Sequence, residues 1–175
     1  MHLGLAEELA AKDPEAAVKL IADARTSSQA ALADLRSLVR GIHPPVLADR
    51  GLPGALEALA LAHPRPVSVD VDLAGRPPAP VESAVYFSVA ESLVNSAKHA
   101  AAQSVWVRVR HESGSLTALI GDDGVGGAVV VPGGGLDGIA RRLDAFDGTV
   151  TVASPLGGPT IVTVAVPCVL LPARS

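Results

Sequence analysis

The chain has 175 residues, and its 14 Lys and Arg against 18 Asp and Glu give a formal net charge of -4. Hydrophobic residues make up 49% and charged residues 18%, as in globular proteins and unlike disordered ones. A single cysteine excludes an internal disulfide, and the acidic balance with 2% aromatic residues argues against nucleic acid as a partner. Glycine (17) and proline (14) are enriched, which indicates either many turns or a site built from glycines.

No apolar run approaches the ~20 residues that a membrane-spanning helix needs. The start of the sequence, from Met1 to Gly4, lacks the basic segment and the apolar stretch of a signal peptide. We therefore expect a soluble, cytoplasmic segment, and whether a longer parent protein carries a membrane anchor is left open.

The first part of the chain predicts a long helix. Asp13 and Pro14 are a helix start signal, and Pro44 and Pro45 prevent the helix from continuing. Between them, residues at alternating spacings of three and four form a heptad seam that is apolar at both ends: Val18, Ile21, Arg25, Ser28, Leu32, Leu35, Val39 and Ile42. Such a seam favours packing against other helices, within the chain or across a dimer, and a single amphipathic helix on its own domain is the alternative.

The rest of the chain predicts an α+β fold. In chain order we expect a short helix at 55–62, a strand at 67–73, a helix at 81–101, strands at 104–111 and 115–121 joined by a turn at Gly114, a glycine-rich loop at 122–135, a helix at 136–146, and strands at 149–153 and 160–166. Most of the consecutive strands can pair antiparallel, and the long helix precedes this domain.

The helix expected at 81–101 carries a possible binding stripe. Its apolar face is predicted to contain Tyr86, Val89, Ala90, Leu93, Ala97 and Ala100. Glu91, Asn95 and Lys98 follow at i, i+4 and i+7 and so share a different face. A carboxylate, an amide and an ammonium on one stripe suit a metal, its water shell and a phosphate. A solvated face with a charge pair is the alternative.

Two glycine-rich motifs follow. The first, at 121–127, places Asp122 at a strand end, where a carboxylate can accept a hydrogen bond from a base amino group while glycine backbone approaches a flat ring. An ordinary Asp-Gly turn is the alternative. The second motif, at 133–139, puts glycines directly before a helix, whose free N–H groups suit a phosphate. A flexible linker is the alternative there.

In this order and at these intervals, the motifs resemble the ATP-binding catalytic domain of sensor histidine kinases, in the superfamily shared with gyrase B and the MutL repair protein. ESLVNSAKHA is similar to the asparagine box, DDGVGG and GGGLDGI to the two glycine boxes, and SPLGGPTIVTVAVP to the final glycine–threonine segment. ALADLRSLVRGIHPPVLADRGLPGALEALA resembles the second dimerisation helix and linker of the nitrate-sensor-like subgroup. The resemblance extends from about Ala30 onward. It implies a Bergerat-type α/β sandwich, a mixed sheet with helices on one face, at 53–175, preceded by a partial helical dimerisation segment and linker at 1–52.

The resemblance also implies ATP and Mg²⁺ as cofactors and a role for each matching residue. The catalytic set would be Glu91, Asn95 and Lys98, with Asn95 holding Mg²⁺ and Glu91 beside the water shell of the metal. Lys98 and His99 would face the phosphates, and a surface histidine is the alternative for His99. Asp122 would accept from the adenine amino group. Of the remaining residues, Gly124 and Gly126 would shape the pocket, Gly135, Leu136 and Gly138 would border the phosphates, and Thr160 would close the adenine side.

Two features depart from the family pattern. The family phosphorylates a histidine that precedes an acidic residue on the first dimerisation helix, and no such pair lies in an expected helix here; His111, before Glu112, ends an expected strand. The chain is therefore expected to begin downstream of the acceptor. In addition, Pro159 separates Gly158 from Thr160, where the family has consecutive glycine and threonine.

The resemblance implies an ATP-binding catalytic core that phosphorylates a histidine on a dimerisation domain, for relay to a response regulator, within a homodimeric full-length protein. The expected partners are therefore the response regulator and the domain that carries the acceptor histidine. A non-catalytic nucleotide-binding regulatory module and a serine kinase of the anti-sigma type are the alternatives.

Overall fold

The computed structural model describes Asp13, Val18 and residues 44–172, and the chain divides into two compact units, residues 1–42 and 43–175. Apart from Asp13 and Val18, the long helix expected at 13–42 and its heptad seam lie outside the described residues. The two units divide after residue 42, whereas the sequence predicted a domain boundary after residue 52. Residue 52 lies inside helix α3 (Pro45–Ala62). Leu47 and Leu52 are both fully buried in the core. No helix in the described part is long and apolar enough to cross a membrane.

A mixed five-stranded sheet organises the second unit. Its strands are β1 (Val67–Asp72), β2 (Val105–Glu112), β3 (Ser115–Asp122), β4 (Thr149–Ala153) and β5 (Thr160–Pro167), in the spatial order β1-β2-β3-β5-β4. β1 and β2 pair in parallel, and the other neighbours pair antiparallel. The expected strands and the turn at Gly114 are confirmed to within about a residue, and so is the α+β fold class.

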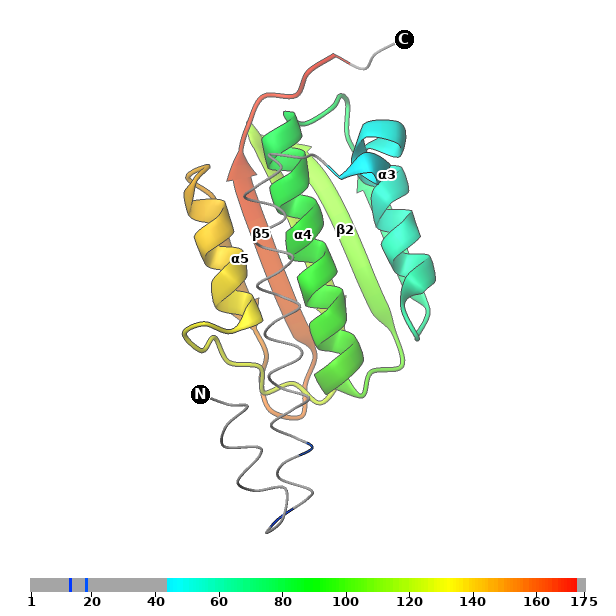
Figure 1. Cartoon of the computed structure of the whole chain (residues 1–175), viewed down its shortest axis with the longest axis vertical. Helices are drawn as coiled ribbons and strands as arrows, with labels where there is room; N and C mark the ends of the chain where they lie inside the picture. The colour runs from blue at the N-terminus through cyan, green and yellow to red at the C-terminus, as the bar shows by residue number, and fades with distance from the viewer. Residues whose placement is uncertain (1–12, 14–17, 19–43, 173–175) are drawn as a thin grey trace. The chain divides into compact units, whose positions relative to one another are not determined.

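Three helices lie side by side over one face of this sheet: α3, α4 (Ala79–Asn95) and α5 (Gly135–Asp144) (Figure 1). The alternation along β2 explains why they cover only one face. Val105, Val107 and Val109 are buried beneath the helices, whereas Arg108 on the opposite face is exposed. The sheet therefore uses one face for the core, as the Bergerat-type expectation requires.

Helix α3 is longer than the helix expected at 55–62, because Pro45 suits a first helical turn. It is kinked at Gly51, whose φ of 62° lies in the left-handed region that glycine adopts without strain. Beyond the kink, the Leu52 N–H donates to Oε1 of Glu82 on α4 at 2.9 Å. Glu82 is fully buried, and its Oε2 accepts from the Arg76 guanidinium at 2.9 and 3.2 Å. A buried carboxylate thus fixes the kinked helix to the central helix.

The helix expected at 81–101 ends as an α-helix at Asn95 and continues as a π-helical turn, η1 (Ser96–Ala100). Ala101 then adopts a left-handed conformation with φ 50°. Because a π-turn holds more residues per turn, the α-helical spacing does not extend past Asn95. Ala97, expected on the apolar face, is therefore exposed, while Ala100 remains buried. Tyr86 and Ala90 are half-buried.

Candidate functional site

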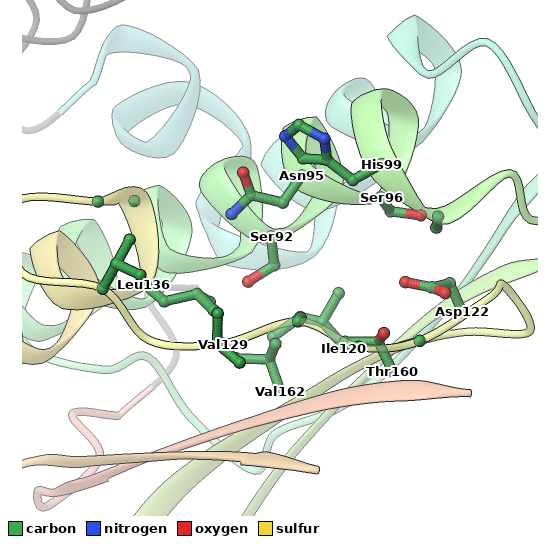
Figure 2. Close-up of a pocket in the computed structure, with 17 residues that line it drawn as sticks. Ser92, Asn95, Ser96, His99, Ile120, Asp122, Val129, Leu136, Thr160 and Val162 are labelled. Atoms are coloured by element: carbon green, nitrogen blue, oxygen red, sulfur yellow. The ribbon is translucent and has the colours of Figure 1, made fainter. Parts of the chain in front are cut away.

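A cavity of about 420 Å³ lies between α4 with its π-turn, the ends of β3 and β5, and the loop that leads into α5 (Figure 2). It brings together a large part of the set expected from the sequence: Asn95, His99, Asp122, Gly126, Gly135, Leu136 and Thr160 all line it. Glu91, Lys98, Gly124 and Gly138 do not line it. The asparagine motif and both glycine motifs therefore meet at one cavity.

Asp122 lies at one end of the cavity, at the last position of β3. Its side chain is 5% exposed, and its Oδ1 accepts from the Gly124 N–H at 3.0 Å. A buried carboxylate with one local donor keeps further lone pairs for a ligand that donates a hydrogen bond. This end is suited to an amino group.

Thr160 pairs with Asp122 across the β3–β5 ladder and lines the same end of the cavity. Its hydroxyl lies 2.8 Å from the Ser154 hydroxyl, which also accepts from the Ala128 N–H at 2.9 Å. Pro159 leaves this arrangement intact, because it lies in the connecting loop and β5 begins at the next residue. Thr160 thus lines the cavity with Pro159 directly before it in the loop.

The first glycine motif is tied to the loop between β4 and β5. Gly126 has a φ of 65°, and a β carbon there would overlap the Pro155 carbonyl oxygen. The Gly157 N–H donates to the Val125 carbonyl at 2.8 Å. A larger residue at 126 would therefore push the two loops apart. Gly124, which is outside the cavity lining, packs instead against Ala100 of the π-turn.

Only some side chains of the expected stripe in the asparagine motif reach the cavity. Lys98 and His99 are both exposed, but only His99 lines the cavity, together with Asn95. In Figure 2 the side chains of Asn95 and His99 lie on the same side of the cavity. The stripe expected at i, i+4 and i+7 is thus replaced by Asn95 and His99 as lining residues.

Glu91 lies beside the start of α5. A β carbon at Gly135 would overlap its Oε1, so the two approach closely without Glu91 entering the cavity lining. Gly134 caps α5 without a side-chain hydrogen bond, and Asp137 in the first turn accepts from the Gly133 N–H at 2.8 Å. The first turn of α5 therefore borders the cavity through Gly134 and Gly135. Gly138 lies deeper in the helix, where its N–H donates to the Gly134 carbonyl at 2.9 Å.

The second carboxylate of the motif has a different role. Asp123 is exposed, and its Oδ1 accepts from the backbone N–H groups of Ser104 and Gln103 at 2.9 and 2.8 Å. These hydrogen bonds, that from Ser104 above all, hold the pKa of Asp123 below its ordinary value of 3.8. Asp123 thus fixes the turn before β2, and only its neighbour Asp122 lines the cavity.

Sequence reasoning missed several lining residues, namely Ser92, Ser96, Ile120, Val129 and Val162. Ser92 and Ser96 follow Ser88 at steps of four, so a helical period in the small polar residues was the available signal. It was obscured because serine is ordinarily an exposed residue. The Ser92 hydroxyl donates to the Ser88 carbonyl at 2.8 Å, which lets it lie buried on this face.

Sequence comparison connects the chain to kinases. Residues 1–47 match the family model described as "Histidine kinase". This match includes residues before Ala30, the position from which the resemblance described above extends. The oxygen sensor histidine kinase NreB of Staphylococcus carnosus (strain TM300) is 30% identical over 143 residues, which cover 77% of this chain and 41% of that protein. The signal transduction histidine-protein kinase/phosphatase DegS of Brevibacillus brevis is 26% identical over 169 residues, covering 89% and 42%.

Structural comparison bears on the fold. The histidine kinase domain of the Erythrobacter litoralis EL346 blue-light activated histidine kinase superposes with a TM-score of 0.53 at 24% identity, covering 63% of this chain and 56% of that one. A second structure of that kinase gives a TM-score of 0.54 at 22% identity, covering 65% and 39%. The curated relatives are more than twice as long as the segment that this chain spans. The chain is thus similar to sensor histidine kinases in its sequence and to a histidine kinase domain in its fold.

Proposed function

We propose that this chain binds Mg-ATP in the cavity and acts as the catalytic core of a sensor histidine kinase, transferring the γ-phosphoryl group to a histidine on a dimerisation domain. The observation that carries the proposal is the arrangement of opposite chemistries along one cavity. In Figure 2 the Asp122 carboxylate and the Thr160 hydroxyl lie at one end and Leu136, at the start of α5, lies at the other, with the Asn95 amide and the His99 imidazole between them. A nucleotide has the matching sequence of groups, a base with an amino group and a chain of phosphates.

At the base end, the Asp122 carboxylate would accept from the adenine amino group. Ile120 and Val162 line the cavity nearby and offer apolar contact to a flat ring. Because Asp122 is buried, its hydrogen bond to a ligand would form away from bulk water, where such bonds contribute more. Thr160, held by Ser154, would close this side.

At the phosphate end, the amide oxygen of Asn95 would be a single protein ligand for Mg²⁺. The described residues contain no group of three or more His, Cys, Asp or Glu side chains that could hold a metal. Mg²⁺ ordinarily takes one or two protein oxygens together with water and substrate phosphates, which a lone amide oxygen beside an ATP site satisfies. When bound, the ion offsets phosphate charge during transfer. Glu91 would act beside the water shell of the metal, and Lys98 would approach the phosphates from the exposed side.

The acceptor histidine would come from a dimerisation domain supplied in trans. His111 cannot serve, because it lies in β2 and its Nε2 is 2.9 Å from the Cys168 carbonyl oxygen. Relay to a response regulator and assembly as a homodimer in the full-length protein belong to this proposal. The match of residues 1–47 to the histidine kinase family model supports it.

Calorimetric titration tests the nucleotide half of the proposal. ATP is titrated with and without Mg²⁺ into the wild type, Asn95→Ala and the control Val94→Ala, which changes an exposed neighbour. We expect Mg²⁺ to strengthen ATP binding by the wild type and the control, and this dependence to vanish in Asn95→Ala. A Mg²⁺ dependence that survives in Asn95→Ala would contradict the assignment of Asn95.

Radiolabel transfer tests the catalytic half. The chain and [γ-³²P]ATP are mixed with a dimerisation domain that carries the acceptor histidine, beside the same domain with that histidine replaced by alanine. We expect acid-labile label on the intact acceptor alone. Acid-stable label would indicate a serine kinase, and nucleotide binding without any transfer would indicate a non-catalytic module.

A further inference from the structure

The Ser96 hydroxyl is a buried polar group that lacks a protein partner. Ser96 is 6% exposed, and its Oγ has no hydrogen-bond partner among the described residues. The other buried side-chain atom in this condition within the described part is Nε2 of His63. Leaving a buried hydroxyl without a partner costs its desolvation free energy, so a group of this kind is expected to be satisfied by something bound.

Ser96 is placed where a bound molecule would reach it. It is the first residue of the π-turn, a deformation that is frequent at functional sites, and it lines the cavity together with Asp122 and Thr160. In Figure 2 the oxygen of Ser96 lies on the side of the cavity where the Asp122 carboxylate is found. Its hydroxyl is therefore at the end of the cavity assigned above to the base.

The neighbouring serine on the same helix shows that this condition is specific to Ser96. Ser92 is 5% exposed and lines the same cavity, but its hydroxyl already donates to the Ser88 carbonyl at 2.8 Å. Ser88 donates in the same way to the Ala84 carbonyl. The π-turn interrupts this series, and the Ser96 hydroxyl proton remains without an acceptor.

We propose that Ser96 is a base-recognition residue, whose hydroxyl donates, directly or through one water, to a purine ring nitrogen next to the amino group that Asp122 accepts. This inference rests on the proposed nucleotide site. When it is ionised, the Asp122 carboxylate can accept hydrogen bonds but cannot donate one, whereas the Ser96 hydroxyl can donate. The two side chains together fit the donor–acceptor edge of adenine, an amino group flanked by the ring nitrogens N1 and N7.

Ser96 also forms part of a smaller cavity of about 220 Å³, which His63 lines as well. A water held there would satisfy the hydroxyl without any role in base recognition. The two situations differ in one measurable respect. Only a hydroxyl that contacts the base makes the effect of its removal depend on which ring nitrogen the nucleotide carries.

The test is a calorimetric titration of ATP, 7-deaza-ATP and 1-deaza-ATP into the wild type, Ser96→Ala and the control Ser92→Ala. We expect Ser96→Ala to lower the affinity for ATP about 3- to 10-fold, the equivalent of one net hydrogen bond. That loss should disappear for the one deaza analogue that lacks the accepted nitrogen. Ser92→Ala should alter the affinity for all three nucleotides by the same factor.

A stability measurement separates recognition from damage to the fold. Because Ser96→Ala removes a hydroxyl without a partner, urea unfolding of the nucleotide-free variant should give a free energy of unfolding equal to or above that of the wild type. An unchanged affinity for ATP, or an equal loss for all three nucleotides, would overturn the role of Ser96. A wild type that binds none of the three would instead overturn the proposed nucleotide site itself.

Discussion

Replacing Glu82 by alanine should destabilise the compact unit at residues 43–175 without touching the cavity. The buried carboxylate accepts from the Leu52 N–H at 2.9 Å and from Arg76 at 2.9 and 3.2 Å. Breaking a buried ion pair by removing one partner costs about 3–5 kcal/mol. The Arg76 side chain is 36% exposed and also donates to the Leu47 carbonyl, so its charge stays partly solvated and hydrogen-bonded, and we expect the lower end, about 3 kcal/mol, to apply.

Urea unfolding followed by circular dichroism measures this loss. The matched control is Glu57→Ala, an exposed carboxylate on α3, the helix that Glu82 contacts, for which the change should stay within about 0.5 kcal/mol. Glu82→Gln should lose less than Glu82→Ala, since an amide oxygen still accepts from the Leu52 N–H. A loss below about 1 kcal/mol for Glu82→Ala would refute the view that this carboxylate fixes α3 to α4.

Two further predictions concern residues around the cavity. Asp123→Asn should remove a pH-dependent part of the stability: because hydrogen bonds from Ser104 and Gln103 lower the pKa of Asp123, the wild-type advantage should be fully present above pH 3.8 and disappear as the pH falls further below it. Urea unfolding between pH 2 and pH 7 tests this, and a difference that grows on acidification would contradict it. Gly121→Ala should shift the fluorescence of Trp106 and destabilise the fold by about 1–3 kcal/mol, since a β carbon there would overlap the indole ring. An unchanged emission spectrum and stability would contradict that packing.

The sheet was predictable because its signals are local. Alternating valines define β2, and Gly114 with a φ of 76° makes the turn into β3. Proline positions marked the helix boundaries less well. Pro44 and Pro45 suggested a linker, yet α3 begins at Pro45, because a proline that ends one helix also suits the first turn of the next.

The buried polar face of α4 was hidden from sequence reasoning. Glu82, Ser88, Ser92 and Ser96 are all buried, although their residue types are ordinarily exposed. Glu82 bonds to Leu52 and Arg76 outside its helix, and the hydroxyls of Ser88 and Ser92 donate to carbonyls of their own helix, whereas the Ser96 hydroxyl has no partner among the described residues. Such partners cannot be inferred from the period of apolar residues.

The cavity was predictable in part for a related reason. Asp122, Asn95 and the glycines before α5 belong to short motifs, and the structure brings them together at one cavity. Of the neighbours Lys98 and His99, only His99 lines the cavity, at the i+7 position of the helix face that also carries Ser92, Asn95 and Ser96. The role of each residue in nucleotide binding remains a prediction.

The most direct test of the central claim is the affinity for Mg-ATP of Asp122→Asn beside Asp123→Asn, measured by calorimetry. The two carboxylates are adjacent in sequence, but only Asp122 is buried and lines the cavity. An amide at position 122 can turn its NH₂ group toward the adenine amino group, where a donor would meet a donor. We predict at least a 10-fold loss of affinity for Asp122→Asn, which corresponds to ~1.4 kcal/mol of binding free energy. For Asp123→Asn we predict less than a 2-fold change. Equal affinities for the two variants would contradict the assignment of this cavity to ATP.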